Sequence, residues 1–218
     1  MVDLGGYTLV VTGFPRSGTS VMMRMLAFAG IEILASDKLK NPQHKHDPYG
    51  CLELDDVGVE IKNSDASWTA NKAVKIVAPY IEWLPIDRPL KAIFMQRDLN
   101  EIVTSLLAMR TVWDIDIAES IVFARGYLEY NLVPTLFVKY HDLMKYPKST
   151  AIRIQDFLKT ELDIESMVKA VDKDARNRYK KVPEITGSDR PDTIIRMDKD
   201  AYTDLTIETY RNPETVAA

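Results

Sequence analysis

The 218-residue chain lacks several features that would by themselves point to a class of protein. It has one cysteine, Cys51, so no disulfide can form within it, and we expect a reducing, cytoplasmic setting. Its longest apolar run near the start, residues 9–11, is far too short for a signal peptide or a membrane span. It also lacks an excess of basic residues, and its formal net charge of −4 argues against a general nucleic-acid binder.

What the chain does contain is the composition of an ordinary globular protein, 46% hydrophobic and 28% charged. This length suffices for one domain, residues 1–218, with a sizeable core. Residues 36–50 are polar and contain two prolines, so we expect a loop that serves as a lid. Residues 181–218 carry only a weak pattern.

Predicted strands alternate with predicted helices along most of the chain. Short apolar segments predict strands at 7–11, 31–34, 73–78, 90–96 and 135–140. Helical patterns lie at 21–27, 52–62, 99–109, 115–130 and 147–159. This order predicts an α/β fold with a mostly parallel central sheet flanked by helices, like that of P-loop NTPases. Because such sheets bind ligands at the carboxyl ends of their strands, the loop after the first strand is the first candidate site.

That loop, residues 13–20, has the sequence Gly-Phe-Pro-Arg-Ser-Gly-Thr-Ser, and we call it the phosphate loop. A strand, Gly-x-x-x-x-Gly and a helix form a turn whose backbone N–H groups converge on an anion. A nucleoside-triphosphate loop continues with lysine after the second glycine, whereas Thr19 and Ser20 follow Gly18 here. The cation stands earlier, at Arg16. No strand ends in an acid suited to magnesium, so we expect no metal.

Three further segments follow the pattern of one family. Arg97 ends a predicted strand and Ser105 stands eight residues later, the segment from Tyr140 continues His-Asp-Leu, and residues 47–53 read Asp-Pro-Tyr-Gly-Cys-Leu-Glu. With the phosphate loop they resemble, in order, the motifs of sulfotransferases that use 3′-phosphoadenosine 5′-phosphosulfate (PAPS), in a small bacterial-type form. The four matches span residues 9–147, about two thirds of the chain.

The resemblance implies a donor site and a reaction. It assigns the 5′ end of PAPS to a run of loop residues, Pro15, Arg16, Ser17, Gly18, Thr19 and Ser20. It assigns the 3′-phosphate to Arg97 and Ser105, and brings Tyr140 near the nucleotide. The implied reaction moves a sulfuryl group to a hydroxyl or amine of a small-molecule or carbohydrate acceptor, without a metal and without nucleic acid.

The residues that would carry out the reaction are less completely assigned than those that would bind the donor. The resemblance implies that Arg16 stabilises the leaving phosphate and that Lys75 is a second catalytic cation. A lysine at the end of a strand is, however, equally often a surface residue.

Val77 stands where cytosolic members have the catalytic histidine, so Glu53 is the candidate base, unless it is only an acid in the first turn of a helix. His44 and His46 of the expected lid are alternative bases. His141 is expected to be a partly exposed loop residue.

Two other functions stay open at this point. A P-loop kinase of small molecules would use magnesium and ATP, and the absent lysine after Gly18 speaks against it. A noncatalytic nucleotide-binding protein would keep the nucleotide pocket but lack a catalytic base. Val77, at the position of the family's catalytic histidine, keeps this alternative open. Aromatic residues such as Tyr80 and Trp83 would line an acceptor pocket or belong to the core. The pattern specifies neither the acceptor nor the oligomeric state.

Overall fold

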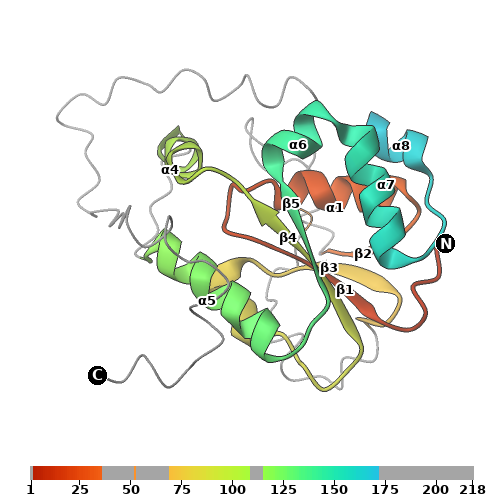
Figure 1. The fold of residues 1–218 in the computed structure, drawn as a ribbon, viewed down its shortest axis with the longest axis horizontal. Helices are drawn as coiled ribbons and strands as arrows, with labels where there is room; N and C mark the ends of the chain where they lie inside the picture. Colours follow the sequence, from red (N-terminus) through yellow and green to blue (C-terminus); the bar gives the residue numbers. More distant parts are fainter. Residues whose placement is uncertain (1, 36–51, 53–68, 109–114, 172–218) are drawn as a thin grey trace.

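The alternation of strands and helices is confirmed in a computed structural model, which describes residues 2–35, 52, 69–108 and 115–171 (Figure 1). The elements in chain order are β1 (Thr8–Thr12), α1 (Thr19–Phe28), β2 (Glu32–Leu34), β3 (Lys72–Lys75), the 3-10 helix η2 (Ala78–Trp83), β4 (Leu90–Gln96), α4 (Leu99–Ala108), α5 (Ile117–Tyr130), β5 (Thr135–Lys139), α6 (Tyr140–Lys145), α7 (Pro147–Leu158) and α8 (Ile164–Lys169). None of the helices in these ranges is long and apolar enough to cross a membrane.

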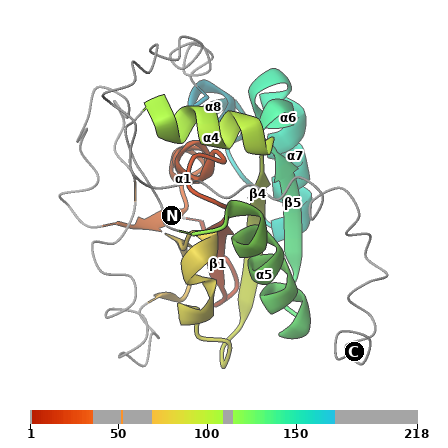
Figure 2. The ribbon, with the colours of Figure 1, turned by 90° about the vertical axis from the view of Figure 1, so that its left-hand side faces the viewer.

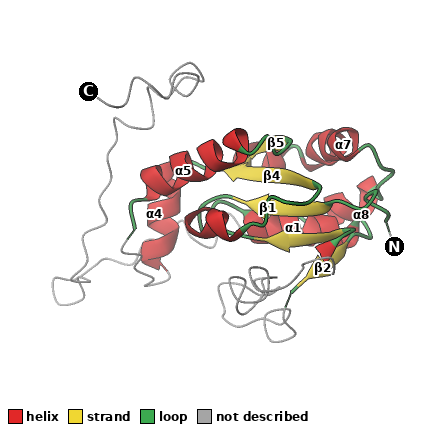
Figure 3. Ribbon diagram, turned by 90° about the horizontal axis from the view of Figure 1, so that it is seen from below, coloured by secondary structure: helices red, strands yellow, loops and turns green. Residues whose placement is uncertain are grey.

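The five strands form one parallel sheet in the order β2-β3-β1-β4-β5, as the α/β prediction requires. β1 lies in the middle, where Val10 is level with Val74 of β3 and Ala92 of β4. Figure 2 shows β4 and β5 running side by side. All strands therefore end at the same edge, and in Figure 3 they point toward α4. The ends of β3, β1, β4 and β5 bring Lys75, the phosphate loop, Arg97 and Tyr140 to that edge in this order.

Two hydrophobic layers cover the sheet, because successive side chains of a strand point to opposite faces. On one face Leu9 and Val11 pack in a cluster with residues of α1, α6, α7 and α8. On the other, Val10 packs with residues of η2, α4 and α5. Every residue of β1 is buried, which explains why its sequence is a continuous apolar and threonine run instead of an alternating one.

Several predicted boundaries need correction. β3 ends at Lys75 instead of residue 78, because η2 begins at Ala78, followed at once by Pro79, which has no N–H for a ladder. Tyr140 begins α6 instead of ending β5, and α6 and α8 were not foreseen. The short α6 follows its strand without a loop, so the sequence gives no turn signal there. The predicted helix at 52–62, the lid at 36–50 and the tail at 181–218 lie outside the described residues, apart from Leu52.

The amino ends of the strands hold the last turn of α7. The Tyr7 hydroxyl donates to the carbonyl of Leu158 (3.3 Å), and the Lys91 ammonium donates to the carbonyls of Phe157 and Leu158 (3.2 Å each). The same ammonium lies 4.4 Å from the centre of the Tyr7 ring. These donors satisfy carbonyls that a helix end leaves without partners. This anchor fixes α7 at the end of the sheet opposite the phosphate loop.

Tyr7→Phe should lower stability and change how stability depends on pH. Burial raises the pKa of Tyr7 to about 12, so the folded state binds the phenolic proton more tightly than the unfolded state. The stability that this tighter proton binding contributes to the folded state is fully present below about pH 10 and is lost as the pH rises toward 12. We expect Tyr7→Phe to lower the free energy of unfolding, measured with urea, by about 0.5–1 kcal/mol near pH 7. Between pH 9 and 11 the free energy of unfolding should then fall less in this variant than in the wild type. Tyr130→Phe, at a position 87% exposed, is the control, and equal alkaline losses in wild type and Tyr7→Phe would contradict the expectation.

Candidate donor-binding site

The phosphate loop is shaped by two close approaches of its glycines to the neighbouring strand ends. Gly13 has a φ of 136°, and a Cβ there would lie 2.6 Å from the carbonyl oxygen of Met95 on β4. Gly18 has a φ of 107°, and a Cβ there would lie 2.6 Å from Cδ2 of Tyr140. Between them the chain turns back on itself, as the N–H of Ser17 donates to the carbonyl of Phe14 (3.0 Å). Only glycine has both the left-handed backbone and the missing side chain that these two positions require.

The loop leads directly into α1, whose N-terminus is left without a side-chain cap. Gly18 is the N-cap residue and has no side chain, and the first turn contains no acid. The first N–H groups of a helix have no partner within it, and they carry the positive end of the helix dipole. The arrangement suits an anion in the curve of the loop, as the glycine spacing predicts.

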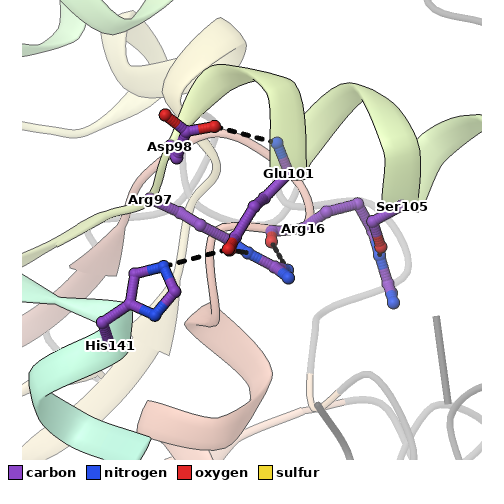
Figure 4. Close-up of polar contacts among 6 residues, drawn as sticks. All are labelled: Arg16, Arg97, Asp98, Glu101, Ser105 and His141. Atoms are coloured by element: carbon purple, nitrogen blue, oxygen red, sulfur yellow. Dashed lines mark hydrogen bonds and ion pairs between the residues drawn. The ribbon is translucent and has the colours of Figure 1, made fainter. Parts of the chain in front are cut away.

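Arg16 connects the loop to β4 and α4. Its backbone is in the left-handed region (φ 73°), and its carbonyl oxygen accepts from Nη1 of Arg97 at 2.8 Å. Its side chain reaches away from the loop, and its Nε donates to Oγ of Ser105 at 2.9 Å (Figure 4). Three predicted site residues from three elements are thus in direct contact. Ser105 is 1% exposed and, accepting from Arg16, still has its own hydroxyl hydrogen to donate.

Arg97 is held from several sides at the end of β4. Its Nε lies 2.9 Å from Oε2 of Glu101, and its guanidinium lies over the Tyr140 ring at 4.3 Å from the ring centre. The Tyr140 ring therefore contacts both Gly18 and Arg97, and Tyr140 is 5% exposed. Stacking of this kind orients a planar cation without using its N–H donors.

Lys75 lies on the opposite side of the loop, at the end of β3. The surface-lysine alternative is wrong, because this residue is only 2% exposed. Its Nζ donates to Oγ of Ser20 in the first turn of α1 at 3.0 Å. This hydrogen bond holds the ammonium beside the first turn of α1, where an anion bound in the loop would lie close to it.

Two buried hydroxyls in this region have no hydrogen-bond partner in the described part of the chain. They are Oγ of Ser17, inside the loop, and Oγ1 of Thr12, the residue just before it. A buried hydroxyl without a partner costs about 1–3 kcal/mol. A ligand anion in the loop offers an acceptor that would recover that cost for Ser17. Thr12 was not foreseen, although a hydroxyl residue at the last position of a buried strand is a visible signal.

Glu101 and His141 also belong to this region, and the sequence did not mark them as a pair. Nε2 of His141 lies 3.1 Å from Oε1 of Glu101, whose other oxygen pairs with Arg97 (Figure 4). The backbone N–H of Glu101 donates to the Asp98 carboxylate at 3.1 Å, so Asp98 caps the start of α4. His141 is partly exposed, as expected, but it lies in the first turn of α6 and not in a loop.

The cations Arg16, Lys75 and Arg97 surround the loop of a protein whose net charge is negative. Local charge, not net charge, determines the attraction of a small anion. The remaining predicted site residue, Glu53, lies outside the described residues, as does most of the segment that was matched at 47–53.

No protein-family model and no curated protein sequence matches the chain. Among solved structures, the mouse sulfotransferase SULT7A1 complexed with PAP matches with a TM-score of 0.50 at 14% identity, over 97% of this chain and 80% of that one. The sulfotransferase domain of the Synechococcus PCC 7002 olefin synthase has a TM-score of 0.46 at 17% identity, over 77% and 78%. A sugar kinase from Janibacter sp. HTCC2649 has a TM-score of 0.39 at 12% identity, over 74% and 98%. The first of these matches shows that the chain shares the α/β fold of the mouse enzyme.

Gly18→Ala should destabilise the protein strongly. An alanine at this φ costs about 1–2 kcal/mol, and its Cβ must displace the Tyr140 ring from its place under Arg97. We expect a total loss above about 3 kcal/mol in chemical unfolding, since overpacking adds a similar amount. Gly5→Ala is the matched control, because Gly5 also has a positive φ (68°) but has nothing within 4 Å of the added Cβ. Equal losses in the two variants would show that the contact with Tyr140 is unimportant.

Proposed function

We propose that the chain is a sulfotransferase that transfers a sulfuryl group from PAPS to a hydroxyl or amine of a small-molecule or carbohydrate acceptor. The observation that carries this proposal is the presence of two cationic positions on either side of one phosphate loop. Lys75 and Ser20 form one, on β3 and α1, and Arg97 and Ser105 form the other, on β4 and α4. The fold shared with the mouse sulfotransferase supports it.

The spacing of these positions suits a nucleotide with phosphates at both ends of its ribose. β3 and β4 flank β1, so their ends are two interstrand spacings apart, about 10 Å. A nucleoside triphosphate keeps its phosphates in one chain and needs no second cationic position across the loop. A donor with a separate 3′-phosphate does need one, and Arg97 offers the forked donors that bind such a group well.

The roles follow from these positions. At the 5′ end Arg16 and the backbone N–H groups of residues 17–20 bind the phosphate, together with the hydroxyls of Ser17, Thr19 and Ser20, while Pro15 shapes the loop. At the other end Arg97 and Ser105 bind the 3′-phosphate, with Tyr140 supporting the guanidinium.

Transfer itself is an in-line displacement in which the acceptor bonds to sulfur while the bond from sulfur to the phosphate oxygen breaks. Negative charge grows on the leaving phosphate, and Lys75 stabilises it from its position beside the first turn of α1. Arg16 stays the second proposed cation, and for this role its side chain would turn from Ser105 toward the loop. The acceptor's proton goes to a base, for which Glu53 stays the proposed residue. Val77 follows β3 at the position expected for histidine and carries no proton acceptor.

Nucleotide binding tests the proposal against its alternatives. We expect adenosine 3′,5′-bisphosphate to raise the melting temperature more than ATP does, with or without magnesium, since only the bisphosphate reaches both positions. Arg97→Met should weaken bisphosphate binding tenfold or more, because hydrogen bonds to charged groups are worth about 1.5–3 kcal/mol. Arg153→Met is the control, since Arg153 is an exposed arginine whose side chain donates to the carbonyl of Phe137. Stabilisation by magnesium–ATP alone would support the kinase instead.

Lys75→Met should separate binding from catalysis. The rate of sulfuryl transfer to a panel of phenols, sugars and amines should fall about 100-fold or more, because the lost cation acts mainly on charge that develops during the reaction. The affinity for adenosine 3′,5′-bisphosphate should change less than about tenfold, since the 3′-phosphate contacts are untouched. Release of the bisphosphate product gives the rate. An unchanged rate would rule out Lys75 as a catalytic cation, and binding without transfer to any acceptor in the wild type would favour the noncatalytic alternative.

A further inference from the structure

Arg97 still has donors for a ligand after its contacts within the protein are counted. A guanidinium has five N–H groups. The contacts above use Nε and one hydrogen of Nη1, and nothing in the described ranges accepts from Nη2. The side chain is nevertheless only 10% exposed and lies at the carboxyl edge of the sheet. A phosphate of the proposed donor suits these unused donors.

The Glu101 carboxylate beside this arginine requires an explanation. A negative charge next to a phosphate position weakens the attraction between Arg97 and the phosphate. At 33% exposed, the side chain could turn toward water, yet both of its oxygens are engaged, one by Arg97 and one by His141. The two contacts come from the end of β4 and from α6, so they hold the carboxylate at Nε of Arg97 (Figure 4).

The strand order makes His141 unsuitable as the missing base. A histidine paired with a carboxylate resembles a general base, but His141 follows β5, whereas Lys75 ends β3. β1 and β4 lie between those strands, so the two residues are three interstrand spacings apart, about 14 Å. The pair lies on the Arg97 side of the loop, where its contacts affect orientation of that arginine.

We propose that Glu101 is a positioning residue: its hydrogen bond fixes the Arg97 guanidinium so that the unused donors meet the second phosphate, and His141 holds Glu101 in place. The inference rests on the proposed function, because it concerns the 3′-phosphate of that donor. Arg97 also holds the left-handed Arg16 through its carbonyl, so the orientation of one guanidinium determines both the phosphate contact and the loop backbone.

Two variants with the same change in charge isolate the hydrogen bond. Glu101→Gln keeps an oxygen that accepts from Nε of Arg97, and Glu101→Met keeps the length of the side chain without an acceptor. Both residues are good helix formers, so α4 should be retained. The measured quantity is the ratio of the affinities for adenosine 3′,5′-bisphosphate and adenosine 5′-phosphate, by calorimetry. Adenosine 5′-phosphate lacks the 3′-phosphate, so its binding also reports whether each variant is folded.

We expect Glu101→Met to lower this ratio about tenfold and Glu101→Gln to stay within about threefold of the wild type, as a hydrogen bond to a charged group is worth about that much. Glu165→Met is the control, since Glu165 forms an ion pair with Lys148 far out on the surface. The proposal would be overturned if the affinity ratio were the same in Glu101→Met, Glu101→Gln and the wild type. It would also be overturned if the ratio fell equally in the two variants, because the effect would then come from the lost charge and not from the hydrogen bond. If Glu101→Met does not fold, Glu101→Ala replaces it with the same expectation. A wild type that does not prefer the bisphosphate would instead overturn the proposed function.

Discussion

The close approach of the phosphate loop to the ends of β4 and β5 is the constraint on which the site depends. Gly18 touches the Tyr140 ring where no side chain would fit, and the same ring lies under the Arg97 guanidinium. Arg97 in turn holds the carbonyl of Arg16 in the loop. This closed series of contacts couples the backbone of the loop to the orientation of its cations. A change at any one member should therefore be felt at the others.

The electrostatics of the site are arranged around that geometry. Three cations would repel one another if they were gathered at one point, but β1 and its loop separate Lys75 from the two arginines. Within the described contacts, a hydroxyl holds Lys75 and another holds Arg16, while a carbonyl, an aromatic ring and one carboxylate hold Arg97. Groups that are already oriented toward an anion need little reorganisation when it binds or gains charge, which is the condition for effective stabilisation of a leaving group.

The residues that local pattern predicts are those whose role depends on their neighbours in sequence. Gly13 and Gly18 are recognisable because a strand, a tight turn and a helix must follow one another within a few residues. Arg97 is recognisable because it ends an apolar strand. Contacts such as those of Lys75 with Ser20 and Glu101 with His141 join residues 40 or more positions apart, and no local signal announces them. Tyr140 was assigned to the correct edge but to the wrong element, since α6 begins without a turn residue.

The sequence by itself determined the α/β class, the parallel sheet, the phosphate loop and most of the residues proposed to bind the donor, because hydrophobic period, glycine spacing and strand ends are local properties. Only the tertiary structure decided which of those residues touch. The order β3-β1-β4-β5 separates Lys75 from Arg97 and brings Arg16 to Ser105, 89 positions away. It also turns Glu101 from an ordinary helix acid into the partner of Arg97 and His141. Strand order arises from how whole elements pack against one another, and that is a property of the complete fold and not of any segment.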